Sequence, residues 1–160
     1  WVNDYFQKEL GIKVIREPQE FEINDRSFLI GHGDGLGPGD YGYKFLKWIF
    51  RNSFFKFLFS CIHPDISIRI GEYLSRKNSV ISGKEIKFES NEKELLFNYC
   101  KKILKSDHYN YFVFGHRHLP LKINLGNNSE YYNCGDWFNH YSYLDFTNSE
   151  LTLKYFNPEI

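Results

Sequence analysis

The sequence predicts an α/β fold in which strands come first, helices follow, and strands return. Two observations predict it. Short apolar runs bounded by turn residues occur towards both ends of the chain, whereas the middle carries helical spacing. The length of 160 residues fits one domain with a buried core. We therefore expect one domain over residues 1–160, with a helical insertion over about residues 42–106.

The first part of the chain predicts the end of a helix and then three short strands. Residues 4–10 have helical spacing, and Gly11 ends them. The strands are expected at residues 13–15, 21–23 and 27–30. Asn24-Asp25 lies between the second and third runs and favours a tight turn, so these two strands should form a hairpin.

The insertion is expected to hold three helices after a glycine-rich loop at residues 31–42. Residues 43–60 contain no helix breaker and predict a single helix. His63-Pro64-Asp65 ends it and starts a second helix, which should run to about Arg76. After a polar connection over residues 77–90, Asn91 and Glu94 resemble a capping box before a third helix that ends near Lys105.

The last part of the chain is expected to be β-rich. The continuous apolar run Tyr-Phe-Val-Phe at residues 111–114 indicates a strand buried on both faces. Two further pairs of strands flank turns at residues 126–129 and 147–150. These strands are expected at residues 121–125, 130–133, 141–146 and 151–156.

Charge and composition argue against several classes of protein. Twenty basic and twenty acidic residues cancel, which argues against a general nucleic-acid binder. Three widely spaced cysteines without a C-x-x-C pair argue against a zinc ribbon or a thioredoxin. No uncharged apolar run reaches about 18 residues, so no membrane-spanning helix is expected. Aromatic residues make up 19% of the chain and suit a surface that meets apolar material.

The candidate functional residues lie in two short motifs in which a histidine directly follows a glycine, called glycine–histidine steps below. Gly31-His32-Gly33-Asp34 and Gly115-His116-Arg117-His118 each follow an apolar strand directly. Ligands of open α/β sheets bind beyond the carboxyl ends of strands, and imidazole binds manganese, iron, zinc or nickel. Taken alone, His116 and His118 could be two histidines in a surface turn, and His32 could be a hydrogen-bonded structural residue. Two such motifs in one domain favour a shared metal site.

This pair of motifs resembles the calcineurin-like metallophosphoesterases, and residues 31–43 are similar to the UDP-2,3-diacylglucosamine pyrophosphohydrolases of lipid A biosynthesis. The resemblance implies an αββα sandwich with a helical cap, of which the chain is the C-terminal portion. It implies two divalent metal ions, with manganese favoured and iron or zinc as alternatives. His32 and His116 match ligands of the second metal, and His118 matches a ligand of the first.

The same resemblance places substrate contacts at Asp40, Ser79, Lys84 and His116. It implies hydrolysis of UDP-2,3-diacylglucosamine to UMP and 2,3-diacylglucosamine 1-phosphate. The family's Asp-x-His, Gly-Asp-x-x-Asp and Gly-Asn-His-Asp motifs do not occur here. We therefore expect the N-terminal remainder of the protein to carry the bridging aspartate, and this chain to be inactive without it.

The predicted cap is where substrate choice should reside. Its aromatic residues could form an acyl-chain cleft, and Lys44, Lys47, Arg51 and Lys56 could meet anionic lipid head groups. This suggests a cytoplasmic protein associated peripherally with the inner membrane. The alternatives are another calcineurin-like phosphodiesterase or nucleotide hydrolase, and a catalytically inactive domain that binds lipid or protein.

Four other residues receive smaller roles. His63 is expected at the start of a helix, and His108 and His140 as surface or hydrogen-bonded residues. Asp136 follows a strand near the expected site. It could orient a ligand histidine or belong to a structural turn, and the turn is the preferred interpretation.

Overall fold

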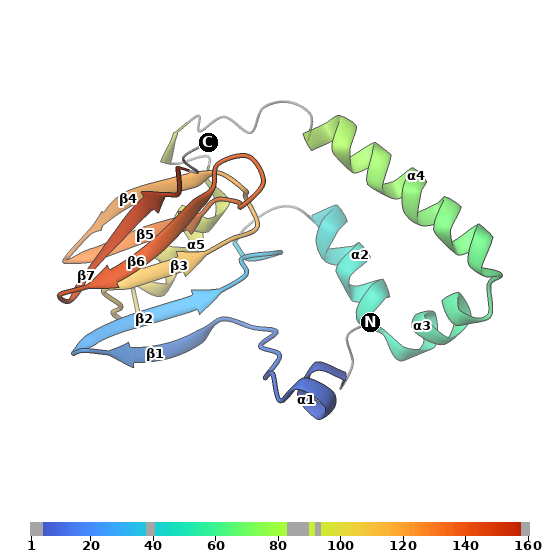
Figure 1. Cartoon of the computed structure of the whole chain (residues 1–160), viewed down its shortest axis with the longest axis horizontal. Helices are drawn as coiled ribbons and strands as arrows, with labels where there is room; N and C mark the ends of the chain where they lie inside the picture. Colours follow the sequence, from blue (N-terminus) through green and yellow to red (C-terminus); the bar gives the residue numbers. More distant parts are fainter. Residues whose placement is uncertain (1–4, 38–40, 83–89, 92–93, 158–160) are drawn as a thin grey trace.

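The computed structural model describes residues 5–37, 41–82, 90–91 and 94–157, except the side chains of Tyr43 and residues 74–82. Within these ranges the order of elements is the predicted one, with strands, then helices, then strands (Figure 1). The elements are α1 (Tyr5–Leu10), β1 (Gln19–Ile23), β2 (Arg26–Gly31), α2 (Tyr41–Arg51), α3 (Ser53–Ser60), α4 (Pro64–Ser82), α5 (Leu95–Ile103), β3 (Tyr111–Phe114), β4 (Pro120–Gly126), β5 (Ser129–Cys134), β6 (Ser142–Thr147) and β7 (Glu150–Tyr155).

A mixed five-stranded sheet forms the centre of the fold, which confirms the α/β prediction. Its strand order is β1-β2-β3-β5-β4. The inner pairs β2–β3 and β3–β5 are parallel, and the outer pairs are antiparallel. All four residues of β3 are buried, as their unbroken apolar run predicted.

The sheet is covered on both faces. On one face Phe112, Phe114 and Tyr131 pack with Leu96 and Cys100 of α5. The hairpin β6–β7 lies over the other face (Figure 1). Its side chains pack against those of the sheet. The residues of this second core are Phe28, Tyr111, Val113, Tyr132 and Leu151. The result is a helix, a large sheet and a small sheet in three layers, each burying an apolar face.

The tight turns explain the sharp hairpins. Asn24 and Asp25 have φ angles of 49° and 58°, and Asn127 and Asn128 have φ angles of 52° and 56°. Two successive residues in the left-handed region match the right-handed twist of the flanking strands, and asparagine and aspartate tolerate that region better than most residues. The predicted hairpin of residues 21–23 and 27–30 is therefore confirmed.

Two predictions about the helical segment are wrong in detail. The single helix over residues 43–60 is broken into α2 and α3 at Asn52, whose extended backbone and side-chain oxygen cap Phe54 N–H at 2.9 Å. The second helix begins at Pro64 as expected but continues to Ser82 rather than Arg76. α2, α3 and α4 lie to one side of the sheets (Figure 1).

Two other predictions are also wrong. Residues 13–15 form no strand, since the chain between α1 and β1 is irregular. The capping box fails because Glu94 is itself the N-cap of α5 and its side chain makes no capping bond. Its backbone N–H instead donates to Asn91 O at 3.2 Å, and its carboxylate contacts the turn after β3, as described below.

Gly135 tests how tightly the loop after β5 is packed. A Cβ at this position would fall on Ser142 Oγ and lie 2.7 Å from Pro120 Cγ, and its φ is +72°. Gly126 provides a matched control because its φ is +83° but a Cβ there would meet nothing within 4 Å. We expect Gly126→Ala to lower the free energy of unfolding by about 1–2 kcal/mol. Gly135→Ala should lower it by about 1–3 kcal/mol more through overpacking, measured by urea denaturation. Equal losses would contradict this packing.

Candidate metal centre

The parallel pairing of β2 and β3 places the two glycine–histidine steps at the same edge of the sheet. Gly31 lies opposite Phe114 in the strand register. The pairing continues one step further, where Gly115 N–H donates to His32 O at 3.0 Å. His32 and His116 then lie side by side, with ring centroids 5.2 Å apart and planes at 75°. The structure thus brings together His32 and His116, two of the predicted site residues.

The turn after β3 has an unusual backbone. His116 and His118 have φ angles of 62° and 52°, and Arg117 N–H between them donates to Gly115 O at 2.7 Å. Left-handed residues other than glycine are uncommon and cluster at functional sites. His118 is exposed at the surface.

The histidine pair fits a metal ion in part. Two neighbouring imidazoles are suitable donors for manganese, iron or zinc. Within the described parts of the chain, no three or more His, Cys, Asp or Glu side chains converge as an ion site. The pair could therefore supply two ligands of one ion, and a two-metal centre would need ligands from elsewhere. The metal ions and the role of His118 stay predictions.

A buried carboxylate forms an ion pair with the histidine turn, and sequence reasoning missed it. Glu94 is 2% exposed, and its Oε2 lies 3.1 Å from Arg117 Nη2. The only sequence signal was the acidic residue at a helix start, which resembled a capping residue instead. Burying a carboxylate requires a partner charge, so this contact links the start of α5 to the turn.

The loop after β2 is tied both to α2 and to α5. Lys47 Nζ lies 2.6 Å from Asp34 Oδ2, and Lys44 Nζ donates to Gly37 O at 2.6 Å. Gly37 has a φ of +82°, and a Cβ there would lie 2.6 Å from Leu95 O, so a larger residue would not fit. Two of the basic residues expected to meet lipid head groups thus bind this loop. A third, Arg51, pairs with Glu17 at 2.8 Å.

Asp136 organises the loop after β5, as the structural-turn interpretation predicted. Its Oδ1 accepts from the N–H groups of Phe138, Asn139 and His140 at 3.0, 2.6 and 3.2 Å, and its Oδ2 lies 3.1 Å from His140 Nδ1. Burial alone would raise the pKa of Asp136, but the hydrogen bonds from Asn139 and His140 outweigh burial and hold the pKa below its ordinary value. Asp136 therefore orients His140 and fixes the backbone of this loop.

The remaining histidines lie where expected. His63 Nδ1 accepts from Asp65 N–H at 3.3 Å at the start of α4. His108 Nε2 lies 2.9 Å from Asn127 O, at the turn between β4 and β5.

Of the predicted substrate contacts, Asp40 and Lys84 lie outside the described residues. Ser79 lies on α4, and its side chain is not described.

The fold and the paired histidines define the class of the protein, which is an α/β protein with a candidate metal-binding edge. No known family model matches the chain. The chain is similar to curated UDP-2,3-diacylglucosamine hydrolases, which confirms the predicted resemblance. It is 27% identical over 168 residues to the enzyme of Porphyromonas gingivalis, covering 96% of the chain and 64% of that enzyme. It is 26% identical over 153 residues to the enzyme of Wigglesworthia glossinidia brevipalpis, covering 96% of the chain and 60% of that enzyme.

A third relative gives the same picture. The UDP-2,3-diacylglucosamine hydrolase of Psychromonas ingrahamii is 20% identical over 154 residues, covering 92% of the chain and 60% of that enzyme. The chain thus spans 60% to 64% of the length of these curated relatives.

Among the described helices, none combines the length and the apolar character that crossing a bilayer requires.

Asp136→Asn tests the charge in the loop after β5, since asparagine keeps an acceptor oxygen. We expect it to lower the free energy of unfolding by about 2 kcal/mol at pH 7, because hydrogen bonds to a charged acceptor are the stronger ones. The pKa of Asp136 is lowered by folding, so its stabilisation is present above the unfolded pKa of about 3.9 and is lost as the pH falls. The difference between wild type and variant should therefore shrink in acid. A difference that stays constant from pH 7 to pH 3 would contradict this assignment.

Proposed function

We propose that the chain is the C-terminal part of a metal-dependent pyrophosphohydrolase that converts UDP-2,3-diacylglucosamine to UMP and 2,3-diacylglucosamine 1-phosphate. The observation that carries the proposal is the 5.2 Å approach of His32 and His116 at one edge of the sheet. Similarity over 92% to 96% of the chain to enzymes named for this substrate supports the choice of reaction.

The complete fold is proposed to be a calcineurin-like αββα sandwich with a helical cap. The layers support this, because a helix covers one face of the large sheet and a second sheet covers the other. The small sheet has two strands among the described residues. In the proposal, the rest of the protein completes both sheets and supplies the carboxylate ligands that the described residues do not bring to the histidines.

In this proposal His32, His116 and His118 hold divalent ions, with manganese favoured and iron or zinc as alternatives. Bound ions supply Lewis acidity, which lowers the pKa of a water and offsets charge at phosphorus. The chain's own part is to fix the imidazoles at the sheet edge, with His116 also facing the phosphate. Asp40, Ser79 and Lys84 are proposed to bind the substrate head group. No nucleophilic side chain is required.

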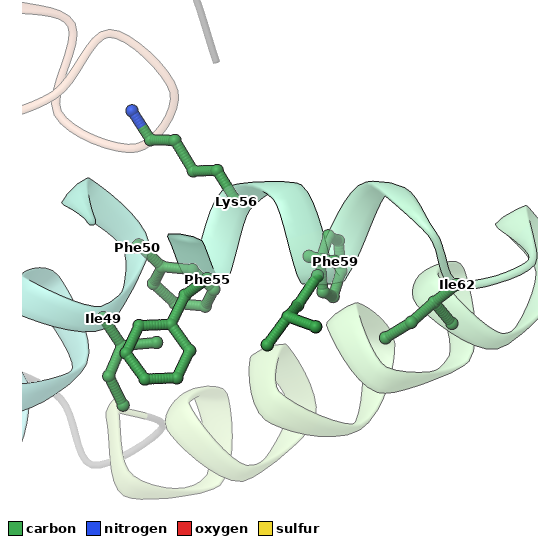
Figure 2. Close-up of a pocket in the computed structure, with 7 residues that line it drawn as sticks. Ile49, Phe50, Phe55, Lys56, Phe59 and Ile62 are labelled. Atoms are coloured by element: carbon green, nitrogen blue, oxygen red, sulfur yellow. The ribbon is translucent and has the colours of Figure 1, made fainter. Parts of the chain in front are cut away.

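The cap is proposed to bind the acyl chains. Phe54 and Phe57 of α3 are 63% and 65% exposed, far more than core aromatics. A pocket of about 200 Å³ lies on α2 and α3, and Figure 2 shows its lining residues. Its lining is Ile49, Phe50, Phe55, Lys56, Leu58, Phe59 and Ile62. An almost wholly apolar lining suits hydrocarbon, while the Lys56 amine extends away from Phe55 and Phe59 (Figure 2).

The proposal also places the protein on the cytoplasmic face of the inner membrane, and the same surface supports the contact with lipid. Exposed aromatic residues beside a basic side chain suit contact with an anionic lipid surface. Of the four basic residues predicted to meet lipid head groups, Lys56 is the best placed, because Lys44, Lys47 and Arg51 bind groups of the protein itself.

Release of UMP from UDP-2,3-diacylglucosamine by the complete protein tests the reaction, with Mn²⁺ added. We expect His32→Ala and His116→Ala each to lower the rate at least about 100-fold, because the lost metal charge contributes several kcal/mol to the barrier. His108→Ala is the matched control, since His108 bonds to Asn127 at the other end of β3. Full activity in both site variants would exclude the proposed centre, and inactivity of a folded, metal-loaded wild type would exclude the substrate.

Phe54→Ser combined with Phe57→Ser tests the cap. We expect at least about tenfold loss of activity on the diacylated substrate, because two apolar contacts are removed, with metal content unchanged. Phe138→Ser is the control, since Phe138 is 84% exposed but lies outside the cap. A cap variant that hydrolyses the diacylated substrate normally would favour another phosphodiesterase or nucleotide hydrolase.

A further inference from the structure

The Glu94 carboxylate occupies an unusual position for a residue at a helix start. Its backbone is extended, with φ −77° and ψ 111°, as an N-cap requires, but its side chain caps nothing. Instead it is 2% exposed and meets Arg117. A buried carboxylate is strongly unfavourable without a cation. The Glu94 side chain therefore contacts the histidine turn and does not cap α5.

Arg117 connects the Glu94 carboxylate to the turn that carries both histidines. It lies between His116 and His118, which are both held in the left-handed region. Backbone of this kind persists where surrounding contacts fix it. Arg117 N–H donates within the turn to Gly115 O, while its guanidinium reaches the start of α5. One residue thus joins the shape of the turn to a helix of the core.

Two buried atoms are placed to form a second contact between Glu94 and Arg117. Glu94 Oε1 and Arg117 Nε are buried and have no hydrogen-bond partner among the described residues. In a bidentate arginine–carboxylate pair, two parallel N–H groups meet the two oxygens. Oε2 and Nη2 already form one such contact, at 3.1 Å. Oε1 and Nε are the complementary atoms for the second.

We propose that Glu94 is a positioning residue for the metal centre. Acting through Arg117, it fixes the turn of residues 115–118 so that His116 stays beside His32 and His118 keeps its direction. The proposal extends the proposed function, since it gives the histidine centre a buried support. It also predicts that metal binding weakens when Glu94 is replaced by a neutral residue, because the support of the turn is then lost.

Hydrogen exchange of the metal-free complete protein tests the positioning directly. In Glu94→Gln, the Gly115 and Arg117 amides should exchange at least tenfold faster than in wild type. Glu130→Gln is the matched control, because Glu130 forms a comparable 3.1 Å ion pair with Lys122 on the sheet, and it should leave these amides unchanged. If Glu94→Gln does not fold, Arg117→Lys replaces it, since lysine keeps the charge but not the bidentate geometry. Unchanged exchange in the turn would overturn the proposal.

Cobalt binding gives a second readout, through the visible absorption of Co²⁺ bound to histidine. We expect Glu94→Gln to raise the dissociation constant at least tenfold, and Arg117→Gln to add little when combined with it. If the wild type binds and Glu94→Gln binds equally tightly, the positioning role is wrong and the proposed function stands. If the wild type shows no band, the metal centre of the proposed function fails, and hydrogen exchange still decides the role of Glu94.

Discussion

The parallel pairing of β2 with β3 is the constraint on which the candidate site depends. Parallel neighbours end at the same edge of a sheet, so the residues that follow them must meet. The bond from Gly115 N–H to His32 O extends the pairing one step beyond the strands. Two histidines that are 84 positions apart in the sequence are thereby brought to a ring separation of 5.2 Å.

The start of α5 supports both loops that leave this edge. Glu94 pairs with Arg117 in the loop after β3. Leu95 and Leu96 lie against the loop after β2, where a Cβ on Gly37 or Gly33 would meet Leu95 O at 2.6 Å or Leu96 Cδ1 at 3.1 Å. Three consecutive residues of one helix thus contact both histidine loops. Because Leu96 is also part of the core, the shape of the site is coupled to the packing of the fold.

Much of this arrangement could be predicted from the sequence. The strand order along the chain, the hairpin at Asn24-Asp25 and the buried β3 follow from local patterns. The repeated glycine–histidine step after an apolar strand favoured a shared site, but the parallel pairing that brings the two steps together was not predicted. The break at Asn52 was harder to predict, because an asparagine within an apolar run is also compatible with a continuous helix. Only the structure shows that the Asn52 side chain caps the start of α3. The contact between Glu94 and Arg117 depends on tertiary structure, and locally Glu94 has the signature of a cap.

Anomalous diffraction from crystals of the complete protein grown with Mn²⁺ tests the central claim most directly. The account predicts a manganese peak bonded to imidazole nitrogens of both His32 and His116, with Glu94 and Arg117 paired beneath the turn. Manganese bound away from both rings, or to one histidine with the other turned aside, would contradict the claim that the two glycine–histidine steps form a single site.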